Sequence, residues 1–223
     1  MASSLKILFA SAEVVPYAKT GGLADVAGAL PQVLAQLGHD VRIIMPRYGS
    51  IDTDKFHLRP LIQPFTIPHG SGELSISLEQ CDAIKGVSTY FIRNDELYHR
   101  DSLYGQTDDD KRFITYCRGI LEVLPKLDWV PDIIHCNDWH TGLVPVYLKT
   151  LYAANPAYAD IATLYTIHNL AYQGNFDPQV VELAGLPWEL FTWDKLAFWG
   201  KFNFMKSGLL YADKLSTVSE KYA

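Results

Sequence analysis

Residues 6–45 read KILFASAEVVPYAKTGGLADVAGALPQVLAQLGHDVRIIM and contain two short apolar runs on either side of a helical pattern. The runs at 6–10 and 41–45 each predict a buried strand. Between them, apolar residues recur at helical spacing from Leu23 to Leu37, and Gly38 supplies a residue that commonly ends a helix. A strand, a crossover helix and a second strand in this order predict a parallel β-α-β unit.

The alternation of helices and strands resumes in the second half of the chain. The expected elements are, in chain order, a helix near 109–124, a strand at 132–136, a helix near 141–151, and strands at 163–167 and 214–219. Three strand-like runs within 61–92, parted by Pro, Gly and Ser, predict an antiparallel excursion from the sheet. The polar segment 94–110 is expected to be a solvated loop. The fold class is therefore α/β, a doubly wound Rossmann-like domain with a mostly parallel sheet.

Composition narrows the class of protein. The 223 residues are 48% hydrophobic and 20% charged, which is typical of a globular domain, here one domain over 1–223. A net charge of -6 without a basic run argues against nucleic-acid binding. No apolar stretch reaches the roughly 18 residues of a membrane span. Cys81, Cys117 and Cys136 are expected to be buried free thiols, which favours a cytoplasmic location, or a plastid for a plant protein. The end at Ala223, shortly after a strand, suggests a fragment.

Three polar loops follow predicted parallel strands, at 13–25, 137–141 and 168–175. The carboxyl ends of parallel strands share one edge of a sheet, where ligands bind in open α/β folds. In the first loop, Gly21 and Gly22 precede a helix, so a diphosphate could approach bare N–H groups with help from Lys19. Asp25 would accept a sugar or ribose hydroxyl. The loop matches neither a Walker loop nor G-x-G-x-x-G, and it also fits a plain glycine turn.

The second and third loops carry a carboxylate, an indole and imidazoles. His135 and Cys136 point to opposite faces of a strand and lack nearby partners, so we expect no zinc site. Asp138 would accept sugar hydroxyls and Trp139 would offer a flat apolar face, although the same residues fit a helix cap and a core indole. His168 stands at a strand end, where it would meet a ligand or serve as a structural histidine. No G-x-S-x-G or H-E-x-x-H motif is present.

Together these segments resemble the bacterial-type glycogen and starch synthases. The matching motifs are KTGGLADVAGALP at 19–31, HCNDWHTG at 135–142, TIHNLAYQG at 166–174, FMKSGLLYAD at 204–213 and TVS at 217–219. The resemblance implies a two-domain GT-B glycosyltransferase that moves glucose from ADP-glucose to the non-reducing end of an α-1,4-glucan, with retention and without a metal or cofactor. This chain would be its N-terminal, acceptor-side domain. The C-terminal nucleotide-binding domain would be its partner, and the piece alone is expected to be inactive or nearly so.

The resemblance also assigns roles to residues. Lys19 and the backbone at Gly21 and Gly22 would face the donor diphosphate, with Asp25 on the donor side. Asp138 and His168 would be the catalytic pair around the transferred glucosyl unit. The sugar-binding and acceptor-side candidates are Glu13, Tyr104, Trp139 and His140.

Three other classes of protein remain open on the sequence alone. The first is a GT-B transferase that uses UDP-glucose, such as a sucrose-synthase-like enzyme. The second is a non-catalytic glucan-binding domain, and the third is a structural α/β domain without a ligand. The response of Lys19 and the glycine turn to a nucleotide sugar would separate the first two classes.

Overall fold

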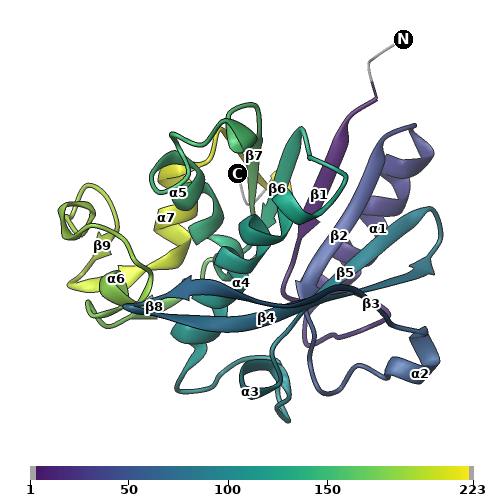
Figure 1. The fold of residues 1–223 in the computed structure, drawn as a ribbon. Helices are drawn as coiled ribbons and strands as arrows, with labels where there is room; N and C mark the ends of the chain where they lie inside the picture. Colours follow the sequence, from purple (N-terminus) through teal and green to yellow (C-terminus); the bar gives the residue numbers. More distant parts are fainter. Residues whose placement is uncertain (1–3, 221–223) are drawn as a thin grey trace.

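The computed structural model describes residues 4–220 and confirms the α/β class (Figure 1). An eight-stranded mixed sheet has the order β11-β7-β6-β1-β2-β5-β4-β3. Its strands are β1 (Lys6–Ala10), β2 (Asp40–Pro46), β3 (Arg59–His69), β4 (Gly72–Ile84), β5 (Val87–Arg93), β6 (Ile133–Asn137), β7 (Ala162–Ile167) and β11 (Lys214–Thr217). The described helices are α1 (Gly22–Gln36), α2 (Thr53–Phe56), α3 (Asp95–Tyr98), α4 (Asp109–Val123), α5 (Leu143–Lys149), α6 (Val180–Leu183) and α7 (Phe204–Tyr211).

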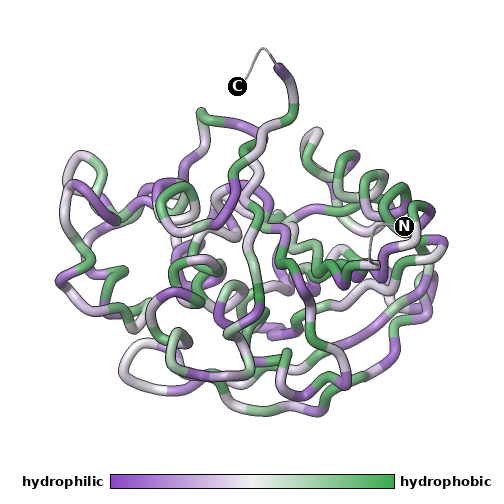
Figure 2. The backbone as a smooth tube through the Cα atoms, turned by 90° about the horizontal axis from the view of Figure 1, so that it is seen from above, coloured by the Kyte–Doolittle hydropathy of each residue, from purple (hydrophilic) through white to green (hydrophobic). Residues whose placement is uncertain are grey.

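The predicted β-α-β unit is confirmed. β1 pairs in parallel with β2, and α1 connects them, beginning at Gly22. Leu8, Phe9 and Ala10 are fully buried because helices cover both faces of a parallel sheet. Figure 2, seen from above, shows α1 at the upper right as a largely hydrophobic coil, in keeping with the burial of Leu23 and Ala27.

The antiparallel excursion is also confirmed. β3 and β4 form a long antiparallel hairpin, and β4 pairs antiparallel with β5, which itself pairs in parallel with β2. β3 is the outermost strand, so the three prolines at 60, 64 and 68 do not remove hydrogen bonds from the interior of the sheet.

The chain changes direction across the sheet at one place. The connection from β1 to β2 runs one way, whereas those from β5 to β6 and from β6 to β7 run the other way. Because parallel crossovers are right-handed, α1 lies on one face of the sheet and α4 and α5 lie on the opposite face (Figure 1). β1 and β6 are neighbours, and the loops that follow them diverge to opposite faces. This is the topological switch point, where open α/β sheets hold ligands.

Two parts of the fold differ from the sequence-based expectation. Residues 94–110 are not simply a solvated loop, because they contain α3 and bury Leu97, Tyr98 and Asp109. The stretch from 168 to about 212, for which the sequence predicts a mixture of helices and loops, also contains a second, three-stranded sheet of β8 (Asn175–Phe176), β9 (Ala197–Phe198) and β10 (Lys201–Asn203). Strands of two or three residues are too short to produce a readable periodicity.

The predicted burial of the cysteines is confirmed, since all three are buried and unpaired within residues 4–220. Over the same residues, no helix combines the length and the apolar character needed to cross a bilayer.

The close packing of Gly142, just before α5, against the start of α7 predicts how a substitution at this glycine changes stability. A Cβ on Gly142 would overlap the backbone carbonyl of Phe204, and backbone atoms cannot rotate away. Gly142→Ala should therefore lower the free energy of unfolding by about 3 kcal/mol, measured by urea denaturation. Gly72→Ala is the matched control, because a Cβ there meets only the His69 carbonyl oxygen at 3.9 Å, an ordinary van der Waals contact, and it should change stability by about 0.5 kcal/mol or less. Equal urea midpoints for the two variants would contradict this packing.

Candidate active site

A cavity of about 700 Å³ lies at the switch point, between the loops that follow β1, β6 and β7. Eight of the ten site residues predicted from the sequence line it: Glu13, Gly21, Gly22, Tyr104, Asp138, Trp139, His140 and His168. The sequence did not single out the other lining residues, which include Thr20, Asp109, Asn169 and Tyr172. Segments separated by up to 205 residues, from 13 to 218, thus meet at one cavity.

Glu13 is buried just beyond the end of β1 and holds the cavity wall together. Its carboxylate accepts hydrogen bonds from the Thr20 backbone N–H, from Thr20 Oγ1 at 2.8 Å, from the Gly21 N–H at 3.0 Å and from the Tyr104 hydroxyl. Tyr104 also contacts the Thr20 hydroxyl. Burial and the bond to Glu13 raise the pKa of the Tyr104 phenol, which keeps it a hydrogen-bond donor. Glu13 therefore positions two loops in the described chain, in addition to lining the cavity.

The N-terminus of α1 faces this cavity with little covering it. Gly21 is the residue before the first helical turn, and no side chain caps the turn. A Cβ on Gly21 or Gly22 would meet nothing within 4 Å, so packing does not require glycine at either position. Because the Gly21 N–H is bound to Glu13, the donors left for an anion are those of Gly22 and the residues after it.

Lys19 and Asp25 do not line the cavity. Lys19 Nζ lies 2.6 Å from Asp25 Oδ1, and both side chains are more than half exposed. Exposed ion pairs contribute little stability, so Lys19 can leave Asp25 at small cost. Within the described chain, these two residues are therefore beside the expected donor site and paired with each other.

Asp138 has a backbone conformation that side chains rarely adopt, with φ 58° and ψ -179°. Its N–H donates to the Thr166 carbonyl at 2.9 Å, and its carboxylate accepts from the Trp139 N–H at 3.0 Å, as the cap that the sequence allowed. Burial raises the pKa of Asp138 to about 7, and the nearby Glu13 adds to the rise. Both the strain and the desolvation oppose folding, which is typical of a residue kept for function.

His168 has one ring nitrogen committed and one available. Its Nε2 lies 2.9 Å from Asn137 Oδ1. The Asn137 amide nitrogen donates to the carbonyls of Ala10 and His135, both at 3.1 Å, and this fixes its oxygen toward His168. Nε2 must then carry the proton, which leaves Nδ1 as an acceptor. Burial lowers the pKa of His168 to about 4, so the ring is neutral at pH 7.

Trp139 and His140 are mostly buried beside the cavity. Their rings stack with centroids 4.0 Å apart, and Phe113 packs edge-on against both. Trp139 is only 7% exposed, which fits the core interpretation better than the expected open sugar-binding face. Neither ring nitrogen of His140 has a hydrogen-bond partner among residues 4–220, although the side chain is 3% exposed. Burial, with Arg112 nearby, lowers the pKa of His140 to about 3.

His135 serves the fold. Its Nε2 lies 2.6 Å from Thr166 Oγ1 on the neighbouring strand, and the residue is outside the cavity lining. Burial lowers its pKa to about 4. Among residues 4–220, no group of three or more His, Cys, Asp or Glu side chains lies together in a way that could hold a metal ion.

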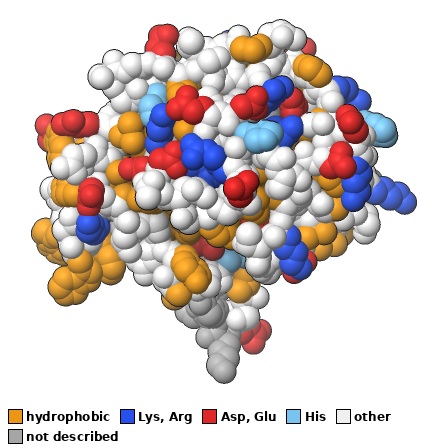
Figure 3. All heavy atoms as spheres, turned by 90° about the horizontal axis from the view of Figure 1, so that it is seen from below, with side chains coloured by type: hydrophobic (Ala, Val, Ile, Leu, Met, Phe, Trp, Pro, Cys, Tyr) orange, Lys and Arg blue, Asp and Glu red, His pale blue; other side chains and the backbone are white. Residues whose placement is uncertain are grey.

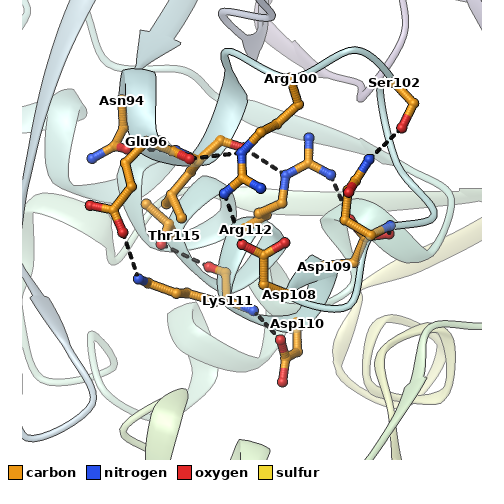
Figure 4. Close-up of polar contacts among 12 residues, drawn as sticks. Asn94, Glu96, Arg100, Ser102, Asp108, Asp109, Asp110, Lys111, Arg112 and Thr115 are labelled. Carbon is orange, nitrogen blue, oxygen red and sulfur yellow. Dashed lines mark hydrogen bonds and ion pairs between the residues drawn. The ribbon is translucent and has the colours of Figure 1, made fainter.

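The loop that carries Tyr104 is fixed by a buried guanidinium (Figure 4). Arg112 has no exposed surface and donates to Asp109 Oδ1 at 2.5 Å, to the Leu97 carbonyl at 2.7 Å and to the Leu103 carbonyl at 2.8 Å. The second oxygen of Asp109 accepts from the Gly105 N–H at 2.6 Å. These bonds give the physical reason why segment 94–110 is not a solvated loop. The only sign of this buried ion pair in the sequence was an acidic residue, Asp109, three positions before Arg112.

Comparison with known proteins gives consistent results. Residues 6–223 match the family model described as the starch synthase catalytic domain. The chain is 45% identical over 224 residues to a glycogen synthase of Moorella thermoacetica, covering 100% of this chain and 45% of that relative. It is 46% identical over 230 residues to a glycogen synthase of Desulforudis audaxviator, covering 98% and 45%. The chain thus spans about half the length of these relatives.

One solved structure is similar over nearly the whole chain. It is the catalytic domain of Starch Synthase IV from Arabidopsis thaliana, bound to ADP and acarbose. The TM-score is 0.91 at 30% sequence identity, and the match covers 99% of this chain and 46% of that one.

The bonds at Glu13 predict a local effect of removing its charge. Glu13→Gln keeps the size of the side chain but replaces two charged acceptor oxygens by one neutral acceptor and one NH2 group, so the four donors at this position can no longer all be accepted as strongly. Stability should fall by about 1–3 kcal/mol, and amide exchange at Thr20 and Gly21 should accelerate, measured by NMR. Glu73→Gln, at an exposed carboxylate, is the control and should leave both unchanged. Unaltered exchange in Glu13→Gln would show that the carboxylate does not hold the loop.

The raised pKa of Asp138 predicts how stability depends on pH. The folded chain keeps a proton to about pH 7 that the unfolded chain releases near pH 4, so the contribution of Asp138 falls as pH rises through this window. Asp138→Asn does not titrate, and its stability relative to wild type should rise between pH 4 and 8 by an amount on the order of 2–4 kcal/mol. Urea denaturation at each pH measures it. Gln36→Ala, an exposed helix substitution, should give a pH-independent difference, and the same flat result for Asp138→Asn would refute the assignment.

Proposed function

The chain belongs to the starch synthase catalytic domain family, and from this membership we propose that it forms the acceptor-side half of a retaining glucosyltransferase. The reaction transfers glucose from ADP-glucose to the non-reducing end of an α-1,4-glucan. The single observation that carries this proposal is the cavity at the switch point, where three loops of the family motifs converge. The similarity to a starch synthase bound to ADP and acarbose supports a nucleotide sugar and a glucan as ligands.

On the donor side, the N-terminus of α1 receives the diphosphate. The N–H groups from Gly22 onward are free of side-chain caps, and the helix dipole favours an anion there. Lys19 exchanges Asp25 for the diphosphate when the donor binds, because both ends of this pair are exposed. Asp25 then remains beside the donor as a hydroxyl acceptor.

The transferred glucosyl unit lies between Asp138 and His168. The free Nδ1 of neutral His168 accepts a hydrogen bond from a sugar hydroxyl. Asp138 has a pKa near 7. When ionised, its carboxylate stabilises the positive charge that develops on the sugar as the diphosphate leaves. On the acceptor side, the glucan end lies against the part of the cavity wall that Glu13, Tyr104, Trp139 and His140 form.

A second domain completes the site in this proposal. The chain spans about half the length of its relatives, and we assign the remaining half to nucleotide binding. Closure of two domains would exclude water from the reacting glucosyl unit and bring charge to the leaving diphosphate. The chain alone should therefore bind its ligands weakly and incorporate glucose negligibly. The buried free thiols favour a cytoplasmic setting.

The proposal is tested by NMR titration of the isotope-labelled chain with ADP-glucose, UDP-glucose and maltoheptaose. We expect saturable shifts at 19–25 with the nucleotide sugars, and at 138–142 and 168–174 with maltoheptaose. A response to maltoheptaose alone would favour the non-catalytic glucan-binding domain. A stronger response to UDP-glucose than to ADP-glucose would favour the UDP-glucose transferase. A well-dispersed spectrum without any shift would contradict the proposal.

His168 provides a test at one residue. His168→Ala removes the acceptor nitrogen from the cavity and should weaken ADP-glucose binding about 10-fold, since one hydrogen bond is worth about 1.4 kcal/mol. The same titration measures the dissociation constant. His99→Ala, at an exposed histidine outside the cavity lining, should bind as wild type does. Equal affinities for the two variants would remove His168 from the site.

A further inference from the structure

A second cavity, of about 780 Å³, has a wall of exposed aromatic side chains. We call it the aromatic groove and define it by Leu170, Trp193, Phe198, Trp199, Lys206 and Leu209. Trp193 is 85% exposed and Trp199 is 92% exposed. Hydrophobic side chains gather at the left of the face in Figure 3, the same end at which Figure 1 shows β9. Concentrated apolar surface of this kind marks a binding site for a ligand or partner.

Trp199 occupies a position that is unfavourable for folding in two ways. It follows β9 and begins the two-residue turn to β10, with φ 50°, and Gly200 follows with φ 76°. Such turns favour Asn-Gly, because asparagine tolerates positive φ far better than a bulky aromatic residue does. The indole ring also remains almost fully in water. Fold stability therefore does not explain a tryptophan at this position.

The groove is held in shape by Lys206 on α7. Lys206 Nζ donates to the carbonyl of Trp193 and to that of Ala197, the latter at 2.7 Å. These bonds tie the backbone that carries Trp193 to β9, which leads to Trp199. Lys206 is the only charged residue of the lining, and its donors are directed to backbone carbonyls. The groove therefore suits an uncharged ligand.

The groove and the candidate active site share one loop. His168, Asn169 and Tyr172 line the active-site cavity, whereas Leu170 and Gln173 of the same loop line the groove. Tyr172, between them, is itself 67% exposed. A polymer that leaves the active-site cavity over this loop therefore reaches the groove along the protein surface.

We propose that the aromatic groove binds the α-1,4-glucan acceptor away from its reacting end, with pyranose rings stacked on Trp193 and Trp199. A pyranose is uncharged, presents an apolar face of C–H groups to an indole ring, and carries hydroxyls at its edge. Neither of these indole N–H groups donates to another residue of the described chain, so both are available to those hydroxyls. This inference rests on the proposed function and extends it from the reacting sugar to the polymer.

The test follows the indole N–H signals of the whole chain in the maltoheptaose titration. We expect the Trp193 and Trp199 signals to shift saturably together with the loop 168–174. Trp199→Asn creates the preferred Asn-Gly turn, so it should fold at least as stably as wild type while binding maltoheptaose about 10-fold more weakly. Trp188→Phe is the matched control, since Trp188 is 47% exposed but outside the groove, and its affinity should be that of wild type.

The outcomes separate this inference from the proposed function. Shifts in 138–142 and 168–174 without shifts of Trp193 and Trp199 would overturn the groove and leave the proposed function standing. Unchanged affinity in Trp199→Asn would also overturn the groove. Loss of every shift would refute glucan binding altogether. Shifts of Trp193 and Trp199 on dilution, without sugar, would assign the groove to self-association instead.

Discussion

A carboxylate buried at the end of a strand must have its hydrogen bonds satisfied, and at Glu13 four donors do this. The rest of the site depends on that requirement, because the donors come from the glycine loop and from Tyr104. Arg112 on α4 is subject to the same requirement with the opposite charge. Its buried guanidinium must donate its hydrogen bonds, and it donates to Asp109 and to two backbone carbonyls. The two networks meet at Tyr104, so the wall of the cavity is fixed from both sides before any ligand arrives.

The sequence predicted the central architecture because buried parallel strands leave long apolar runs, as at 6–10 and 41–45. It also predicted that the loops after β1, β6 and β7 meet at one edge, where the structure has the cavity, since topology alone brings them together. It did not predict the order within segment 94–110. Two hydrogen bonds of Arg112 go to backbone carbonyls. Because every residue type has a backbone carbonyl, no pattern of residues predicts these bonds.

The sequence also did not predict which aromatic side chains are exposed to solvent. Trp139 was a candidate sugar platform because of its motif, yet packing with His140 and Phe113 makes it a core residue. Trp193 and Trp199 lie in a region without readable periodicity and were not among the candidate residues, although they are the two most exposed indoles of residues 4–220. Whether an indole faces water depends on the small sheet of β8, β9 and β10, whose pairing joins residues 175 to 203 in three dimensions.

The amide of Asn137 gives the cavity a property that no charged group supplies. Its nitrogen donates to the carbonyls of Ala10 on β1 and His135 on β6, so the backbone of these paired strands fixes which nitrogen of His168 is protonated. The imidazole therefore accepts a hydrogen bond from a ligand through Nδ1 and cannot donate one there. A shift of the strands that rotated the Asn137 amide by half a turn would place its NH2 group against Nε2, and the proton of His168 would then sit on Nδ1. The cavity would present a hydrogen-bond donor where it now presents an acceptor, with no change in charge.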